Sequence, residues 1–173
     1  MQDYHDLWVS RKWKRAGEIC QNFKLFGKDI SPNDIMQGGV GDCYFLASVA
    51  SFAERPNRVR AMFHNKVANS AGCYLIKLYV NGVPSGIMVD DLFLTDGFKM
   101  NFANCKNEKL WVPLLEKAWA KLLGSYTRID GAYIESEVLH TFTGSPSKNM
   151  LHDVFIKDQT KKRLHWEMLK SAD

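Results

Sequence analysis

The most chemically distinctive stretch of this sequence is QGGVGDC at residues 37–43, which runs directly into an apolar segment ending at Ala53. A cysteine in the first turn of a helix faces N–H groups without intrahelical partners, at the positive end of the helix dipole. Both features favour the thiolate, which is the nucleophilic form of the side chain. The stretch therefore predicts Cys43 as a nucleophile, against the plainer alternative of a buried, inert cysteine.

Gln37 is the natural partner of that nucleophile. Glycines at 38, 39 and 41 allow the backbone to fold tightly ahead of the helix, which brings the Gln37 side chain round beside the sulfur. We expect the Gln37 amide N–H and the backbone N–H of Cys43 to point at the same developing oxyanion.

Two helices are predicted to position these residues. Asp42 is a suitable N-cap, apolar residues then recur at helical spacing through Ala53, and Pro56 forces an end. The second helix is LWVPLLEKAWAKLL at 110–123, an amphipathic pattern with proline in its first turn and Gly124 at its C-terminus.

The remaining elements complete an α+β prediction. CYLIKLYV at 73–80, the Asn81-Gly82 turn and IMVDDLFL at 87–94 predict a small antiparallel sheet. A short helix is expected over 57–67 and a basic helix over 159–169. We read residues 1–35 as an irregular arm with short helical pieces, and 124–149 as loop.

The composition indicates a globular protein. The chain has 173 residues, 46% of them hydrophobic and 24% charged, which is typical of one globular domain and excludes whole-chain disorder, collagen and coiled coil. A net charge of +4 does not by itself indicate nucleic-acid binding. No stretch approaches the roughly 18 apolar residues of a membrane span, and the first residues lack a signal-peptide core.

The cysteines point to a reducing compartment. No two of them form a CxxC pair, so a zinc site on that spacing is not expected. Without a secretion signal, a disulfide framework is not expected either. We therefore predict an intracellular, cytoplasmic protein with reduced thiols at Cys20, Cys43, Cys73 and Cys105.

Several segments, in order along the chain, resemble calpain-type cysteine proteases, a papain-like family. The active-site segment of that family resembles QGGVGDCYFLASVASFAERP (37–56). Further matches are WKRAGEI (13–19), SPNDIMQG (31–38), VDDLFLT (89–95), LWVPLLEKAWAKLLGSY (110–126) and TFTG (141–144). The resemblance implies the first protease subdomain, mainly helical around a central buried helix with a small sheet, over 1–144. Residues 145–173 would be the truncated start of the second subdomain.

The resemblance implies that Cys43 is the nucleophile and Gln37 the oxyanion-hole donor of an endopeptidase acting on protein substrates through a thioester acyl-enzyme. Tyr44 stands where the family usually has tryptophan. The histidine and asparagine of the triad belong to GHA-like and NPW-like motifs, which this sequence lacks. It therefore resembles the nucleophile half of a calcium-dependent protease, either excised or naturally separate. We expect it to be inactive without the second subdomain.

Calcium ligands are also implied by the resemblance. They correspond to the carbonyls of about Gly27 and Asp29, the carboxylate of Asp34 and, one position out of register, Glu108. The position that matches the family's glutamate is Lys109, and a lysine cannot ligate calcium. Either the loop presents Glu108, or the site is weak or lost, or Asp34 is simply a capping residue in an ordinary loop.

Two other functional classes remain at this point. A calpain-like module without the base would bind peptide or calcium and cleave nothing. A transglutaminase-like Cys-His-Asp enzyme shares a nucleophile on a helix, but the SPNDIMQG and LLEKA segments do not support it.

Overall fold

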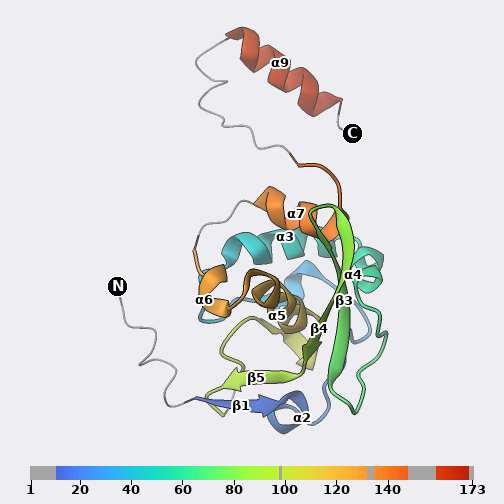
Figure 1. Cartoon of the computed structure of the whole chain (residues 1–173), viewed down its shortest axis with the longest axis vertical. Helices are drawn as coiled ribbons and strands as arrows, with labels where there is room; N and C mark the ends of the chain where they lie inside the picture. The colour runs from blue at the N-terminus through green and yellow to red at the C-terminus, as the bar shows by residue number, and fades with distance from the viewer. Residues whose placement is uncertain (1–10, 98, 132–134, 148–158, 172–173) are drawn as a thin grey trace.

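A computed structural model describes residues 11–97, 99–131, 135–147 and 159–171 of the chain. Two helices run through the middle of the molecule, α3 (Cys43–Ala53) and α5 (Trp111–Leu123) (Figure 1). Both begin and end where local signals place them. Asp42 holds the N-cap of α3, and Gly124 closes α5 in the left-handed conformation with φ of 108°. The predictions for these two helices are confirmed.

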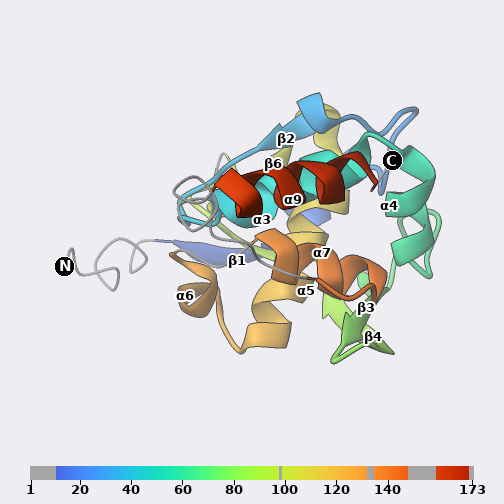
Figure 2. The same ribbon diagram turned by 90° about the horizontal axis from the view of Figure 1, so that it is seen from above.

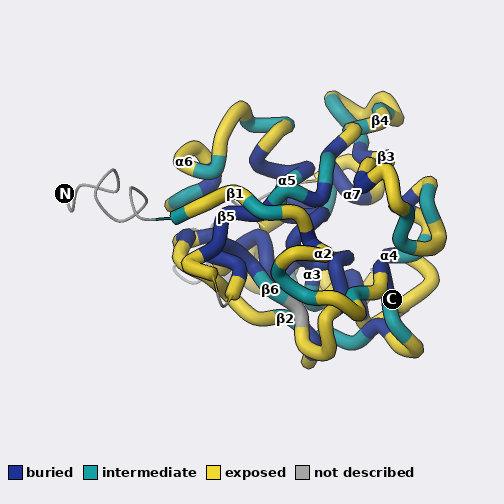
Figure 3. The backbone as a smooth tube through the Cα atoms, turned by 90° about the horizontal axis from the view of Figure 1, so that it is seen from below, coloured by how far each residue is buried: buried dark blue, intermediate teal, exposed yellow. Residues whose placement is uncertain are grey.

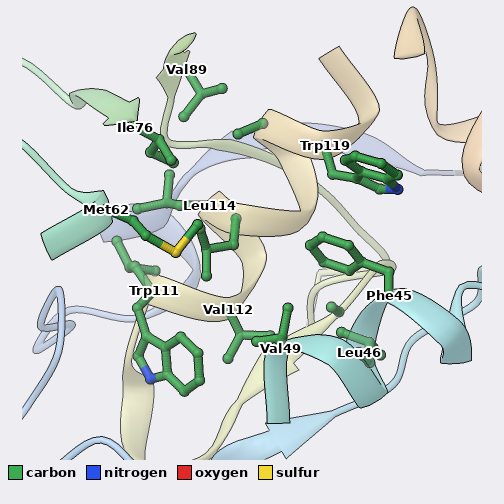
Figure 4. Packing of buried hydrophobic residues seen from close by; sticks show 14 of the residues in the cluster. Phe45, Leu46, Val49, Met62, Ile76, Val89, Trp111, Val112, Leu114 and Trp119 are labelled. Carbon is green, nitrogen blue, oxygen red and sulfur yellow. The ribbon is translucent and has the colours of Figure 1, made fainter. Parts of the chain in front are cut away.

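The core is formed where α5 packs against α3 on one side and a β-hairpin on the other. Trp111, Leu114 and Trp119 of α5 lie among Phe45 and Val49 of α3 in a continuous buried cluster (Figure 4). Phe45 stacks on Trp119 with ring centroids 5.7 Å apart. Figure 3 shows that buried positions gather along these two helices.

The hairpin consists of β3 (Cys73–Val80) and β4 (Val83–Asp90), paired antiparallel. Asn81 and Gly82 connect them, both with positive φ, at 52° and 77°. This is the two-residue turn that an Asn-Gly pair favours because its twist matches that of the flanking strands. The predicted antiparallel hairpin is therefore confirmed.

The strand predicted over 87–94 is in fact two strands. After β4 the chain turns at Asp91, and β5 (Leu92–Thr95) pairs instead with β1 (Lys12–Arg15). The buried Asp91 carboxylate accepts a hydrogen bond from the Arg15 guanidinium at 2.6 Å. Part of the segment that we read as an irregular arm is therefore a strand.

Short elements connect these pieces. The N-terminal half contributes α2 (Ala16–Ile19), the 3-10 turn η1 (Pro32–Asp34), β2 (Ile35–Met36) and α4 (Pro56–Met62). The other half contributes β6 (Asn104–Cys105), which pairs with β2, and the turn η2 (Lys106–Glu108). The short helix expected after Pro56 is present, although it ends earlier than predicted.

The prediction of loop over 124–149 is wrong. This segment holds α6 (Tyr126–Ile129) and α7 (Glu135–Thr143). Helix α7 lies alongside α3 and β3 (Figure 2) and buries Val138 and Phe142, whose ring contacts Phe45 and Phe52. Two buried side chains four residues apart hold this otherwise polar segment in a helix, so tertiary packing overrides its weak local pattern.

The predicted basic helix is present as α9 (Gln159–Lys170) and lies apart from the body in Figure 1. Its side chains are mostly exposed, Leu164 and Trp166 among them. We expected the tail from 145 onward to pack loosely, and its stretch 148–158 lies outside the described residues. Of the helices in the described ranges, none has the length and apolar character needed to cross a bilayer.

Candidate active site

Cys43 is the first residue of α3, and its thiol is free and exposed. The exposed side of the helix begins there and continues through Ala47 and Ser51, one and two turns later. The opposite side is buried against α5 and α7. The packing of α3 thus presents the sulfur to solvent at the helix N-terminus, beside backbone N–H groups that have no intrahelical partner.

The glycine loop ahead of Cys43 is held by segments far away in the sequence. Gly39 N–H donates to the Asn101 carbonyl at 2.7 Å, and Gly41 N–H donates to Asp130 Oδ1 at 2.9 Å. The Gly41 carbonyl in turn accepts from Gly131 N–H at 3.2 Å. A side chain at position 41 would collide with Asp130, since a Cβ there would lie 2.6 Å from its Oδ1.

Gln37 lies at the start of this loop, as predicted, and its side chain braces the loop. Nε2 donates to the Val40 carbonyl at 2.9 Å, which closes the turn that carries the glycines. An amide nitrogen has two N–H groups. The bond to Val40 uses one of them, and the residue is exposed at this position.

A cleft of about 350 Å³ lies beside the loop. Gln37, Gly38 and Gly39 line one part of it, and Met100, Asn101 and Phe102 line another. The absence of side chains on both glycines leaves backbone exposed to whatever enters the cleft.

Tyr44, directly after the nucleophile, ties α3 to two other elements. Its buried hydroxyl donates to the Ile129 carbonyl of α6 at 3.1 Å and accepts from Trp119 Nε1 of α5, also at 3.1 Å. An indole at position 44 could not make both bonds, because it carries a donor and no acceptor. The tyrosine is therefore integrated into the packing through its hydroxyl.

We predict that Tyr44→Phe lowers the free energy of unfolding by about 1–3 kcal/mol, because it leaves a buried N–H and a buried carbonyl without this partner. Tyr126→Phe is the matched control, since the buried Tyr126 hydroxyl has no hydrogen-bond partner among the described residues. Urea denaturation of both variants measures the difference. Equal losses in the two variants would contradict the role given to the Tyr44 hydroxyl.

Asp42 lies at the predicted N-cap position, but its side chain does not cap the helix. That side chain makes no capping hydrogen bond and is fully buried. Burial raises the pKa of the Asp42 carboxyl, and burial together with the nearby Asp42 raises that of Glu116 well above its usual value. Both Glu116 oxygens accept from Ala103 N–H, at 3.0 and 2.9 Å. A pair of buried acids therefore lies directly behind the nucleophile.

Comparison with known proteins identifies the family. The sequence profile of the calpain family cysteine proteases matches residues 2–173. This chain belongs to the calpain family.

Individual calpains agree with that assignment. The chain is 35% identical to human Calpain-12 over 137 residues, which covers 77% of the chain and 19% of that protein. It is 33% identical to mouse Calpain-5 over 148 residues (79% and 23%) and 31% identical to Calpain-5 of Caenorhabditis elegans over 155 residues (84% and 24%). The chain thus spans less than a quarter of the length of each of these calpains.

Three histidines of this calpain-family chain lie in the described residues, at His64, His140 and His165. His140 is in α7, where its Nδ1 lies 2.5 Å from the Ser145 carbonyl, and His64 follows α4. Within the described ranges, no hydrogen bond joins a histidine to Cys43. His5 and His152 lie outside the described residues.

Three of the four residues expected to bind calcium, Gly27, Asp29 and Asp34, come together, but around a lysine. Lys109 Nζ donates to Asp34 Oδ2 at 2.6 Å and to the Asp29 carbonyl at 2.8 Å. Glu108 is exposed and lies beside Cys20, where burial and this carboxylate together raise the pKa of the thiol. No group of three or more potential metal-ligating side chains occurs in the part of the chain that the structure describes. These residues do not fit a calcium ion, which takes six to eight oxygen ligands.

Sequence reasoning missed the residues that hold the loop. Asp130, Asn101 and Phe102 contact the glycines from positions that no local motif connects to Cys43. The carboxylate of Asp130 next to Gly131 could have been recognised as a turn residue, although not as a partner of Gly41.

Proposed function

We propose that this chain is the nucleophile-bearing half of a calpain-type cysteine endopeptidase. Family membership supports cysteine-protease chemistry. The observation that carries the assignment is the exposed Cys43 thiol at the first residue of α3, directly after the Gln37 loop. Protein substrates would enter along the cleft that the loop lines.

In the proposed reaction, Cys43 Sγ bonds to the scissile carbonyl carbon of a substrate, and the carbonyl oxygen becomes an oxyanion. The free N–H of the Gln37 amide and the Cys43 backbone N–H stabilise that charge. The C–N bond then breaks, the amine leaves with a proton, and a thioester remains until water hydrolyses it. A histidine must take the proton from the Cys43 thiol and give it to the leaving amine, and an asparagine must orient that histidine. We propose that the second protease subdomain provides both.

We also propose that the protein works in a reducing, cytoplasmic setting, because the thiols of Cys20, Cys43 and Cys73 are all free. The same cysteines provide an internal test of the nucleophile. Cys43 and Cys73 are both exposed, but only Cys43 lies at the N-terminus of a long helix.

We predict that iodoacetamide modifies Cys43 several-fold faster than Cys73, because the exposed Cys43 thiol lies beside the unpaired backbone N–H groups at the start of α3. Cys20 should react slowest, since its pKa is raised. Mass spectrometry of the intact thiols over time gives the three rates in one sample. Equal rates at the two exposed thiols would overturn the argument from the helix N-terminus.

A casein cleavage assay distinguishes the proposed half-enzyme from a chain that is active alone and from a non-catalytic module. The chain alone should leave casein intact, because its sequence lacks the GHA-like and NPW-like motifs that carry the histidine and the asparagine. Adding a calpain second subdomain that carries the histidine and asparagine should start cleavage that Cys43→Ser abolishes. Cleavage by the chain alone, lost in Cys43→Ser, would contradict the half-enzyme. Peptide binding to an assembled pair without cleavage would favour a non-catalytic module.

A further inference from the structure

A nearly buried ion pair joins two loops on the side of the molecule where η1 and η2 lie. The side chains of Lys109 and Asp34 are only 8% and 9% exposed, and Lys109 Nζ lies 2.6 Å from Asp34 Oδ2. The same ammonium also donates to the Asp29 carbonyl at 2.8 Å. Asp34 Oδ2 accepts in addition from Ser31 N–H at 3.0 Å. The ammonium is thus surrounded by a carboxylate and a main-chain carbonyl, both from the loop at 27–36.

The loop is shaped around the lysine stem. Gly27 has φ of 69°, and a Cβ at this position would lie 2.9 Å from Lys109 Cε. Any side chain at 27 would therefore push the lysine out of its place. Backbone hydrogen bonds align the two segments on either side, from Lys24 N–H to the Glu108 carbonyl at 3.0 Å and from Leu110 N–H to the Lys24 carbonyl at 2.9 Å.

A divalent cation cannot share this position with the lysine. A calcium ion at the Asp34 carboxylate would meet an ammonium within a few ångströms, and like charges at that distance in a nearly buried site repel strongly. Glu108, the carboxylate next to Lys109 in sequence, is exposed beside Cys20 and does not complete an oxygen shell. An ammonium, by contrast, has three N–H donors, two of which are already satisfied here.

We propose that the Lys109 ammonium is the resident cation of this loop and takes the place of calcium. It holds η1 against the segment before α5 without any metal. Since η1 packs against α3 and leads through β2 to Gln37, this tether supports the loop of the candidate active site permanently. The inference does not depend on Cys43 being a nucleophile, and its test measures stability and metal binding rather than cleavage.

The first experiment uses the unmodified chain. Its melting temperature should be the same in EDTA and in millimolar calcium, and calorimetric titration should show no calcium binding. Backbone amide NMR signals of 27–36 and 106–111 should not move on titration. A calcium-dependent rise in melting temperature that Asp34→Asn removes would overturn the proposal.

The second experiment removes the charge and keeps the stem. Lys109→Met should lower the melting temperature by roughly 10 °C, because it strands the nearly buried Asp34 carboxylate. Lys106→Met, at an exposed lysine in the same segment, is the matched control and should change little. The double variant Lys109→Met with Asp34→Asn should regain much of the loss, because no charge remains to be buried.

Two results with these variants would contradict the proposal. A Lys109→Met protein as stable as Lys106→Met would refute the tether. A double variant no more stable than Lys109→Met alone would show that the stranded charge is not the cause. If Lys109→Met does not fold, the calcium titration of the unmodified chain still decides whether a metal binds at Asp34.

Discussion

Gly38→Ala should lower the free energy of unfolding by about 3 kcal/mol or more, the largest effect that we expect from adding one methyl group to this protein. A Cβ at position 38 would lie 2.1 Å from the Phe102 carbonyl oxygen and 2.2 Å from its carbon. These are backbone atoms, held next to the β2–β6 pairing of Met36 with Asn104. They cannot swing aside as the end of a flexible side chain would, so the loop itself must move.

Gly39→Ala is the control for that prediction. A Cβ at position 39 would lie 3.3 Å from the Asn101 carbonyl oxygen, a tight contact that a small shift relieves. We expect this variant to lose about 1 kcal/mol or less. Urea denaturation gives both values, and the alkylation rate of Cys43 reports whether the loop has moved. Similar losses in the two variants would contradict the close approach of Phe102.

Glu116→Gln should stabilise the protein increasingly as the pH rises. The pKa of Glu116 in the folded state is raised well above its usual value, first by burial and then by Asp42. A carboxyl group whose pKa is higher in the folded state than in the unfolded state contributes to stability fully below its unfolded-state pKa. That contribution to stability is lost as the pH rises through the folded-state pKa. Glutamine has no proton to lose and keeps an oxygen for Ala103 N–H.

The expected gain is about 1 kcal/mol for each pH unit above the unfolded pKa of glutamate, up to the folded value. The stabilities of the two proteins should therefore be similar near pH 4 and diverge by about pH 8. Glu137→Gln, at an exposed glutamate of α7, should give no such divergence. A constant offset between Glu116→Gln and the unmodified protein across this range would contradict the buried acid pair.

Local signals were sufficient for the main helices and the hairpin. Pro56 and Gly124 act within a turn or so of the helix ends that they set, and the Asn81-Gly82 pair adopts the conformation that its residue types favour. Asp42 is at the N-cap of α3 as predicted, although its side chain does not cap the helix. Helix α7 and strand β1 could not be found in this way. The helix depends on Phe142 reaching Phe45 and Phe52, and the strand depends on a partner eighty residues away.

The candidate site, too, could be predicted only in part from the sequence. Cys43 and Gln37 lie in one short segment, so spacing alone places them in neighbouring turns. The sequence also showed that Lys109 stands where a carboxylate was expected. Nothing local indicated that its ammonium would reach Asp34 and Asp29, because that contact depends on how two loops meet in the folded chain.

The hydrogen bond from Gly41 to Asp130 has a consequence for biosynthesis. The backbone around the nucleophile is held by residues near 101 and near 130, so it cannot take its final form while those residues are still being translated. A nascent chain that has emerged only as far as α4 already carries Cys43 but lacks the structure that holds the glycine loop. The thiol therefore emerges before the residues that hold its loop, and a nascent chain that ends before Asp130 has the cysteine without the hydrogen bond that fixes Gly41.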